Sequence, residues 1–156
     1  MAFPLMPDVK GQAPTIVVST LAAHLRPDAF LAHRLPESVS LAFQYHSRLG
    51  PLLIHLSNNI DSRLDLAEAA RIVHMERTAF SKFFRRATGI TYREFLRIIR
   101  ISKAAGLLLS CDASITEVAL SVGYADPSLF GKHFRSLTGF RPNQYRHRSP
   151  NHMVAA

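Results

Sequence analysis

The sequence predicts an all-α fold in which two short pairs of helices are joined by one long helix. Three observations predict it. Residues 66–85 read as two short helices separated by a tight break. A related pattern returns about 50 residues later. Between the two copies, residues 92–110 form the longest run with helical periodicity. A hydrophobic fraction of 47% is ample for a core.

Residues 1–47 are expected to form a loosely ordered N-terminal arm. Five of the nine prolines lie before residue 37. Residues 15–20 are the one β-branched run of any length, and a strand there would have no partner, so no sheet is predicted. Residues 22–35 could form a broken helix, and residues 40–46 a short one.

The first helix pair follows a helix that is expected to start at Pro51, where a missing N–H costs nothing. Asp65 is a suitable N-cap, and Glu68 three residues later completes a capping-box pattern. The break falls at residues 73–76. Gly89 can take the left-handed conformation that ends the second helix of the pair.

The second helix of this pair is amphipathic and basic. Its predicted core side carries Phe80, Phe83 and Phe84. Basic and polar residues lie largely off that side: Arg77, Ser81, Lys82, Arg85 and Arg86. Two short helices joined by a few residues, the second of them basic, indicate a helix-turn-helix that places its second helix in DNA.

The predicted helix over residues 92–110 could span the molecule and link its two halves. Three arginines recur on one of its faces, namely Arg93, Arg97 and Arg100. This face could be solvated, contact phosphate, or pair with carboxylates. The carboxylates considered for Arg100 are Glu68, Glu94 and Glu117.

The second helix pair repeats the signals of the first. Ser114 and Glu117 form a capping-box pattern, and Gly123 suits a left-handed turn. Asp126 is a suitable N-cap with Pro127 in the first helical position. A further short helix is expected to begin at residue 142, and the tail from residue 149 to be frayed.

The two pairs align as an internal repeat. Their second helices match at an offset of 50 residues in core and basic positions alike: Phe80 with Phe130, Lys82 with Lys132, Phe84 with Phe134, and Arg85 with Arg135. A repeat in core positions alone would mean only that two helix pairs pack alike. Because the basic positions repeat as well, the sequence indicates two copies of one binding surface.

Net charge supports a polyanionic partner. The chain carries a net charge of +8, and residues 63–156 hold fifteen basic against seven acidic residues, whereas residues 1–62 are neutral. The single cysteine excludes an intramolecular disulfide and fits a cytoplasmic, nucleoid-associated protein. No apolar run is long enough to span a membrane.

The spacing of the two copies suits duplex DNA. Major grooves on one face of DNA recur roughly every 34–36 Å. A linking helix of about 19 residues, at about 1.5 Å per residue, could hold two recognition helices near that separation. If the rigid spacing falls short, the DNA must bend, which adds shape readout to base readout.

The second pair also carries a long spaced signature. It contains Ile115, Val118, Ala119, Gly123, Tyr124, Asp126, Ser128, Phe130, Phe134, Arg135, Gly139, Pro142, Tyr145 and Arg146. With it, the chain resembles the AraC/XylS family of bacterial transcription regulators over about residues 48–148. The resemblance implies homeodomain-like helix-turn-helix units at about residues 65–88 and 114–138, a linker helix, and a sequence-specific, activator-type regulator with both recognition helices in adjacent major grooves of a promoter. Residues 149–156 would be a tail.

The resemblance also implies site residues. In the first recognition helix the base-reading positions fall on Arg77, Thr78, Ser81 and Lys82. In the second they fall on Pro127, Ser128, Gly131 and Lys132. Expected phosphate contacts are Arg85, Arg86 and Arg135. The second set is poor in side chains that reach bases, so the first is expected to carry more of the discrimination.

Two positions depart from the family pattern. His74 stands where the first turn usually has glycine, and a positive φ is expected there because histidine is among the few residues that tolerate it. Tyr92 stands where proline is usual before the linker helix. Only about 47 residues precede the resemblance, which indicates a short or truncated regulator.

Other functions find less support in the sequence. The eight histidines lack metal-ligand spacing, and Cys111 has no base beside it, so neither a metal, a cofactor nor an enzyme is predicted. The expected partner is double-stranded DNA, with RNA polymerase as a further candidate, bound by a monomer or weak dimer. The alternative is an interaction protein whose residues 1–50 bind another regulator or polymerase while its DNA affinity is weak.

Overall fold

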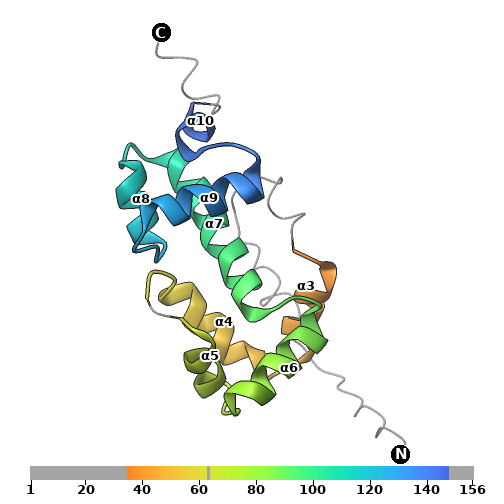
Figure 1. The fold of residues 1–156 in the computed structure, drawn as a ribbon. Helices are drawn as coiled ribbons and strands as arrows, with labels where there is room; N and C mark the ends of the chain where they lie inside the picture. The colour runs from red at the N-terminus through yellow and green to blue at the C-terminus, as the bar shows by residue number, and fades with distance from the viewer. Residues whose placement is uncertain (1–34, 63, 148–156) are drawn as a thin grey trace, which may run out of the picture.

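The computed structural model describes residues 35–62 and 64–147, which form eight α-helices and no strand (Figure 1). The helices are α3 (Glu37–Tyr45), α4 (Leu49–Asn58), α5 (Leu66–Ile72), α6 (Arg77–Thr88), α7 (Tyr92–Ser110), α8 (Ile115–Ser121), α9 (Pro127–Thr138) and α10 (Pro142–Arg146). The predicted all-α fold is confirmed. The expected segments before residue 35 and the expected tail lie outside the described residues.

Helix α7 runs through the middle of the molecule and separates two hydrophobic cores (Figure 1). Helix α6 packs on its N-terminal part and shares one core with α3, α4 and α5, whereas α8, α9 and α10 pack on α7 in the second unit. Phe95 and Ile99 of α7 belong to the first core, whereas Ile101 and Leu108 belong to the second. The predicted linker helix over residues 92–110 therefore joins two separately packed units.

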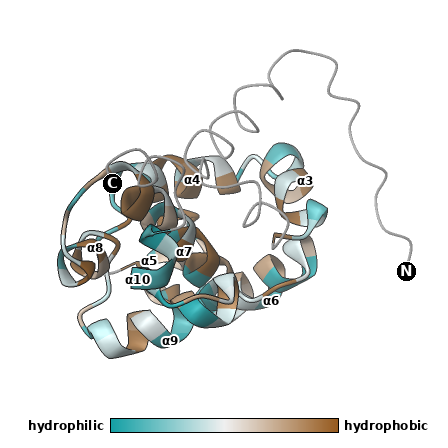
Figure 2. Cartoon of the chain, turned by 90° about the horizontal axis from the view of Figure 1, so that it is seen from above, coloured by the Kyte–Doolittle hydropathy of each residue, from teal (hydrophilic) through white to brown (hydrophobic). Residues whose placement is uncertain are grey.

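The first core is rich in aromatic rings. Phe43 of α3, Phe80 and Phe84 of α6, and Tyr92 and Phe95 of α7 are buried, with neighbouring ring centroids 5.3–6.4 Å apart. The described helices carry hydrophobic and hydrophilic residues on different sides, as Figure 2 shows by hydropathy. Burial of these large rings adds to that of the leucines of α4 in driving the folding of this unit.

Helix α3 adds to the first core from outside the expected domain boundary. It lies upstream of residue 48, where we expected the DNA-binding domain to begin, and it packs on α6. Val39, Ala42 and Phe43 are buried, and the Ser38 hydroxyl donates a hydrogen bond to the Thr88 carbonyl at 2.7 Å. The folded unit therefore extends upstream to at least residue 37.

The ends of α6 and α9 repeat in atomic detail. Thr88 and Thr138 are both buried, and each hydroxyl donates to the carbonyl four residues earlier, at 2.7 and 2.8 Å. Gly89 and Gly139 follow with φ angles of 80° and 82°. The left-handed helix end expected at Gly89 is thus present, and it occurs twice.

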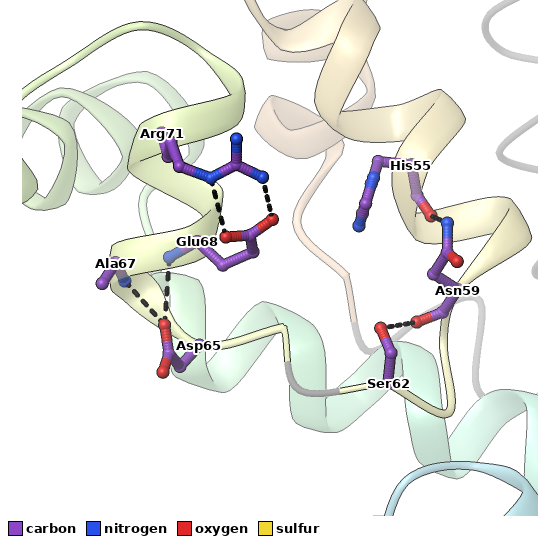
Figure 3. Close-up of polar contacts among 7 residues, drawn as sticks. All are labelled: His55, Asn59, Ser62, Asp65, Ala67, Glu68 and Arg71. Carbon is purple, nitrogen blue, oxygen red and sulfur yellow. Dashed lines mark hydrogen bonds and ion pairs between the residues drawn. The ribbon is translucent and has the colours of Figure 1, made fainter.

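Capping at the start of α5 differs from the expectation. Asp65 is the N-cap, and its carboxylate accepts from the N–H groups of Ala67 and Glu68 at 3.0 Å (Figure 3). Glu68 does not complete a capping box. Its carboxylate pairs instead with Arg71, at 2.5 and 3.0 Å, because a bidentate charged partner one turn later outcompetes a single backbone N–H. The box predicted at Ser114 and Glu117 is present.

Candidate nucleic-acid interface

The two helix-turn-helix turns have the same backbone shape. His74 has a φ of 55° and is the one described residue other than glycine with a positive φ; Gly123 stands in the matching place with a φ of 84°. In each turn the following N–H closes back on α5 or α8, from Met75 to Ala70 and from Tyr124 to Ala119, both at 2.9 Å. The expected left-handed turn at His74 is confirmed.

Each recognition helix begins with a carboxylate cap. Glu76 accepts from the N–H groups of Thr78 and Ala79 at 2.7 and 3.0 Å, and Asp126 accepts from Ser128 at 2.8 Å. The two backbone hydrogen bonds hold the pKa of Glu76 below its usual value of 4.5. Asp126 and Pro127 take the positions that the sequence predicts. The N–H of Ser128 is therefore occupied and is not free to hold a phosphate.

The outward side of α6 carries the candidate residues of the first unit. Phe80 and Phe84 point into the core and are fully buried. All of the candidates are exposed: Arg77, Thr78, Ser81, Lys82, Arg85 and Arg86. Thr78, Lys82 and Arg85 follow one another at i, i+4 and i+7, which places them along one stripe of the helix. This stripe can face a groove as a unit.

The outward side of α9 repeats this arrangement with shorter side chains. Pro127, Ser128, Lys132 and Arg135 are exposed. Gly131 has no atom within 4 Å of the place where a Cβ would stand, so open space lies over the helix at that point. The second helix can therefore approach a surface closely at its middle, while Lys132 and Arg135 supply its charge.

Two further residues of α9, Leu129 and His133, lie outside the candidate set that the sequence predicts. Leu129 is 44% exposed on the same helix, and an exposed aliphatic side chain can contact thymine methyl groups. His133 is half-buried, and its Nδ1 lies 3.0 Å from the Tyr124 hydroxyl. Burial, followed by the charge of Arg97, lowers the pKa of His133, which favours the neutral ring at neutral pH.

The charge on both helices is uncompensated by nearby acids. Among the described residues, the ion pair is Glu68 with Arg71, which lies on α5 and outside both recognition helices. Lys82 and Arg85 on α6, and Lys132 and Arg135 on α9, pair with no described carboxylate. Their cationic groups are thus available to a polyanion.

Arg100 of the linker helix has partners that we did not expect. It contacts none of the carboxylates considered from the sequence. Its guanidinium donates to three backbone carbonyls, those of Ile60 at 3.2 Å, Ser62 at 2.8 Å and Gly123 at 3.3 Å. The carbonyls of a turn lack the backbone N–H partner that a helix would supply. A guanidinium that lies beside them can donate to them instead.

Comparison with known proteins agrees with this geometry. A family model described as a helix-turn-helix domain matches residues 69–148, about half of the chain. The chain is 32% identical over 108 residues to the RCS-specific HTH-type transcriptional activator RclR of Escherichia coli, covering 69% of the chain and 38% of that protein. It is 29% identical over 117 residues to the HTH-type transcriptional activator RhaR of Salmonella dublin, covering 75% and 42%. The chain thus spans less than half the length of these relatives.

Solved structures share the fold. The DNA-binding domain of the global transcriptional factor AdpA, solved in complex with a target DNA, is 27% identical, with a TM-score of 0.63 over 70% of this chain and 97% of that one. An AraC-type regulator from Chromobacterium violaceum is 21% identical, with a TM-score of 0.60 over 65% and 90%. Every described helix is too short or too polar to cross a bilayer.

Proposed function

The chain belongs to the AraC/XylS family of helix-turn-helix proteins, and from that premise we propose that it is a sequence-specific transcription regulator that inserts α6 and α9 into adjacent major grooves of a promoter. The observation that carries the proposal is the matched pair of recognition helices. Both have a carboxylate cap, a buried phenylalanine pair and an outward cationic side without a described acidic partner. A structure of similar fold, bound to its target DNA, supports it.

Helix α6 is the main base reader in this proposal. Lys82 lies in its middle, is exposed, and has the reach to donate to the guanine edge. Arg77, Thr78 and Ser81 complete the reading side. Arg85 and Arg86 lie one turn further along and hold phosphates, which fixes the register of the helix without adding sequence information.

Helix α9 mainly positions the protein. Pro127, Ser128 and Gly131 offer little side-chain reach, whereas Lys132 and Arg135 carry charge to the backbone of the DNA. The open space over Gly131 lets this helix sit close to the groove floor. Specificity at this half-site then depends more on shape and deformability of the duplex than on base contacts.

The proposed role of the protein at its promoter is based on the relatives RclR and RhaR. Those named above are activators, so we propose that the protein recruits or contacts RNA polymerase at its promoter, in the cytoplasm, and does so as a monomer or weak dimer with two half-sites read by one chain. No enzymatic step enters this role, because the relatives are regulators.

A second candidate function rests on an apolar surface. Leu41 and Tyr45 of α3 are 49% and 71% exposed, and Ile54 of α4 is 64% exposed. Exposed apolar side chains mark a protein interaction site where they form one contiguous patch, so this alternative requires that the three side chains act together. In this alternative, residues around α3 bind another protein, and the DNA contacts are weak and non-specific.

Selection of bound duplexes from a random library separates the two functions. Sequence-specific binding enriches one motif with two half-sites about one helical turn apart. The binding-module alternative yields salt-sensitive retention of all duplexes without a motif. Recovery of no motif at moderate salt, from protein with helical circular dichroism, would overturn the proposed function.

A further inference from the structure

Arg100 connects the two units by side-chain hydrogen bonds. It stands in the middle of α7, between the stretch that serves the first core and the stretch that serves the second. Its Nε and Nη2 donate to the loop after α4, at Ile60 and Ser62, and its Nη1 donates to Gly123 in the turn between α8 and α9. One planar guanidinium thus binds backbone from both units at once.

The acceptors lie in a loop and a turn that local backbone hydrogen bonds hold together. The loop after α4 is held by its own hydrogen bonds, because the Ser62 N–H and hydroxyl both bind the Asn59 carbonyl, at 3.1 and 2.7 Å, and the Asn59 amide binds the His55 carbonyl at 3.1 Å (Figure 3). This loop precedes α5 in the chain, and Gly123 lies in the turn before α9. A shift of either unit would therefore have to break bonds to Arg100.

Gly123 and Arg100 also fit each other sterically. A Cβ at residue 123 would lie 2.8 Å from Nη2 of Arg100 and 3.0 Å from the Ile60 carbonyl oxygen. The second turn, the arginine and the first-unit loop are therefore in close packing contact at this point. Atoms packed this closely leave little space for one unit to shift against the other.

We propose that Arg100 fixes the separation and relative orientation of α6 and α9, and thereby sets the spacing of half-sites that the protein accepts. This inference rests on the proposed function, because half-site spacing has meaning only if both helices enter DNA. Arg100 is a positioning residue in this account. It touches no DNA and acts through the backbone of the two units.

The chemistry requires arginine at this position. Its fork presents several N–H donors in fixed directions, so three carbonyls can be served together. Lysine would keep the charge, but its N–H donors all lie on one nitrogen at the end of a flexible side chain. Methionine would keep much of the length and remove every donor. The pair of substitutions separates charge from geometry.

The test uses duplexes that carry the selected half-sites with the spacer changed in steps of one base pair. One added base pair moves a half-site by about 3.4 Å and turns it by about 35°. The unaltered protein is expected to lose about tenfold in affinity per step away from its optimum. Arg100→Met and Arg100→Lys are expected to vary less than about threefold across the same series. Arg93→Met removes one exposed charge from the same helix and should keep the sharp preference.

A second measurement needs no DNA. Spin labels at Tyr45→Cys in α3 and Asn143→Cys in α10, both exposed, report the distance between units in a Cys111→Ser background. The distance distribution should be narrow in the unaltered protein and broad in Arg100→Met. The proposal is overturned if the unaltered protein and Arg100→Met have equally narrow distance distributions, or if they have equally sharp preferences for one spacer length. If neither the unaltered protein nor its variants gain affinity from a second half-site, the proposal that both helices enter DNA is wrong. The spin-label distances then test by themselves whether Arg100 holds the two units together.

Discussion

His74 and Gly123 occupy the same place in the two helix-turn-helix turns, and both have a positive φ, 55° and 84°. One is a side chain of six ring and Cβ atoms and the other has none, yet the turns close with the same backbone hydrogen bond at 2.9 Å. The first turn therefore keeps its geometry at a conformational cost that the second does not bear, since left-handed backbone costs an L-residue about 1–2 kcal/mol.

Replacing His74 with glycine should stabilise the protein. The strain is relieved, and part of the gain is lost to the greater freedom of glycine in the unfolded chain, so the expected net gain is about 0.5–1 kcal/mol. Urea unfolding followed by circular dichroism measures it. Gly123→Ala is the matched control and should cost at least about 1 kcal/mol, because it adds both strain and the close contact with Arg100. Lower stability of His74→Gly would mean that the imidazole makes a contact that outweighs the strain.

Tyr92→Phe should also stabilise the protein. The Tyr92 hydroxyl is buried in the first core without a hydrogen-bond partner, and burial raises the pKa of that phenol. A buried hydroxyl that lacks a partner costs about 1–3 kcal/mol, so its removal should gain about 1 kcal/mol.

Tyr124→Phe is the matched control for Tyr92. It removes a hydroxyl that is bonded to His133 at 3.0 Å, and it should therefore cost about 0.5–1.5 kcal/mol. Thermal unfolding of the three proteins gives the comparison. Equal changes in melting temperature for Tyr92→Phe and Tyr124→Phe would show that the presence of a hydrogen-bond partner does not determine how loss of the hydroxyl changes stability.

The capping carboxylate of α6 should make stability depend on acid pH. Its pKa lies below the ordinary 4.5 in the folded protein, so Glu76 stabilises the fold above that pH, and the contribution is lost as pH falls through the lower, folded value. Glu76→Gln should therefore be less stable at neutral pH but lose less on acidification. Glu117→Gln should behave alike, because the Glu117 carboxylate accepts from the backbone N–H of Ser114, the N-cap of α8, and that hydrogen bond likewise lowers its pKa. Unfolding free energies at pH 7, 4.5 and 3 check this, and parallel losses in all three proteins would contradict it.

The sequence allowed the helices to be predicted because their signals are local. The linker helix was expected over residues 92–110 and has those bounds, since its apolar periodicity is local and continuous. The caps at Ser114 and Asp126 were predictable for the same reason. The repeat of core phenylalanines and helix-ending glycines located both units.

The interactions that could not be predicted depend on competition or on distant backbone. Glu68 had two local partners, and a sequence pattern does not weigh Arg71 against a backbone N–H. Solvent, phosphate and carboxylates were the alternatives for Arg100 because side-chain charges are visible in a sequence. The carbonyls of Ile60, Ser62 and Gly123 become acceptors only once the two units have packed. Helix α3 follows the proline-rich stretch that ends at Pro36. A short helix was expected over residues 40–46, but its place in the first core depends on packing against α6, which a local pattern does not show.

The account's central claim is that α6 reads sequence while neighbouring cations hold the backbone. Binding of Lys82→Ala and Arg86→Ala to the selected duplex and to a scrambled duplex, across a salt series, tests it most directly. Lys82→Ala should weaken binding to the selected duplex by about 1–3 kcal/mol and change binding to the scrambled one far less. Arg86→Ala should weaken both alike and reduce the salt slope by about 1. If folded Lys82→Ala bound the selected duplex as tightly as the unaltered protein, α6 would not read bases through Lys82, and the claim would be contradicted.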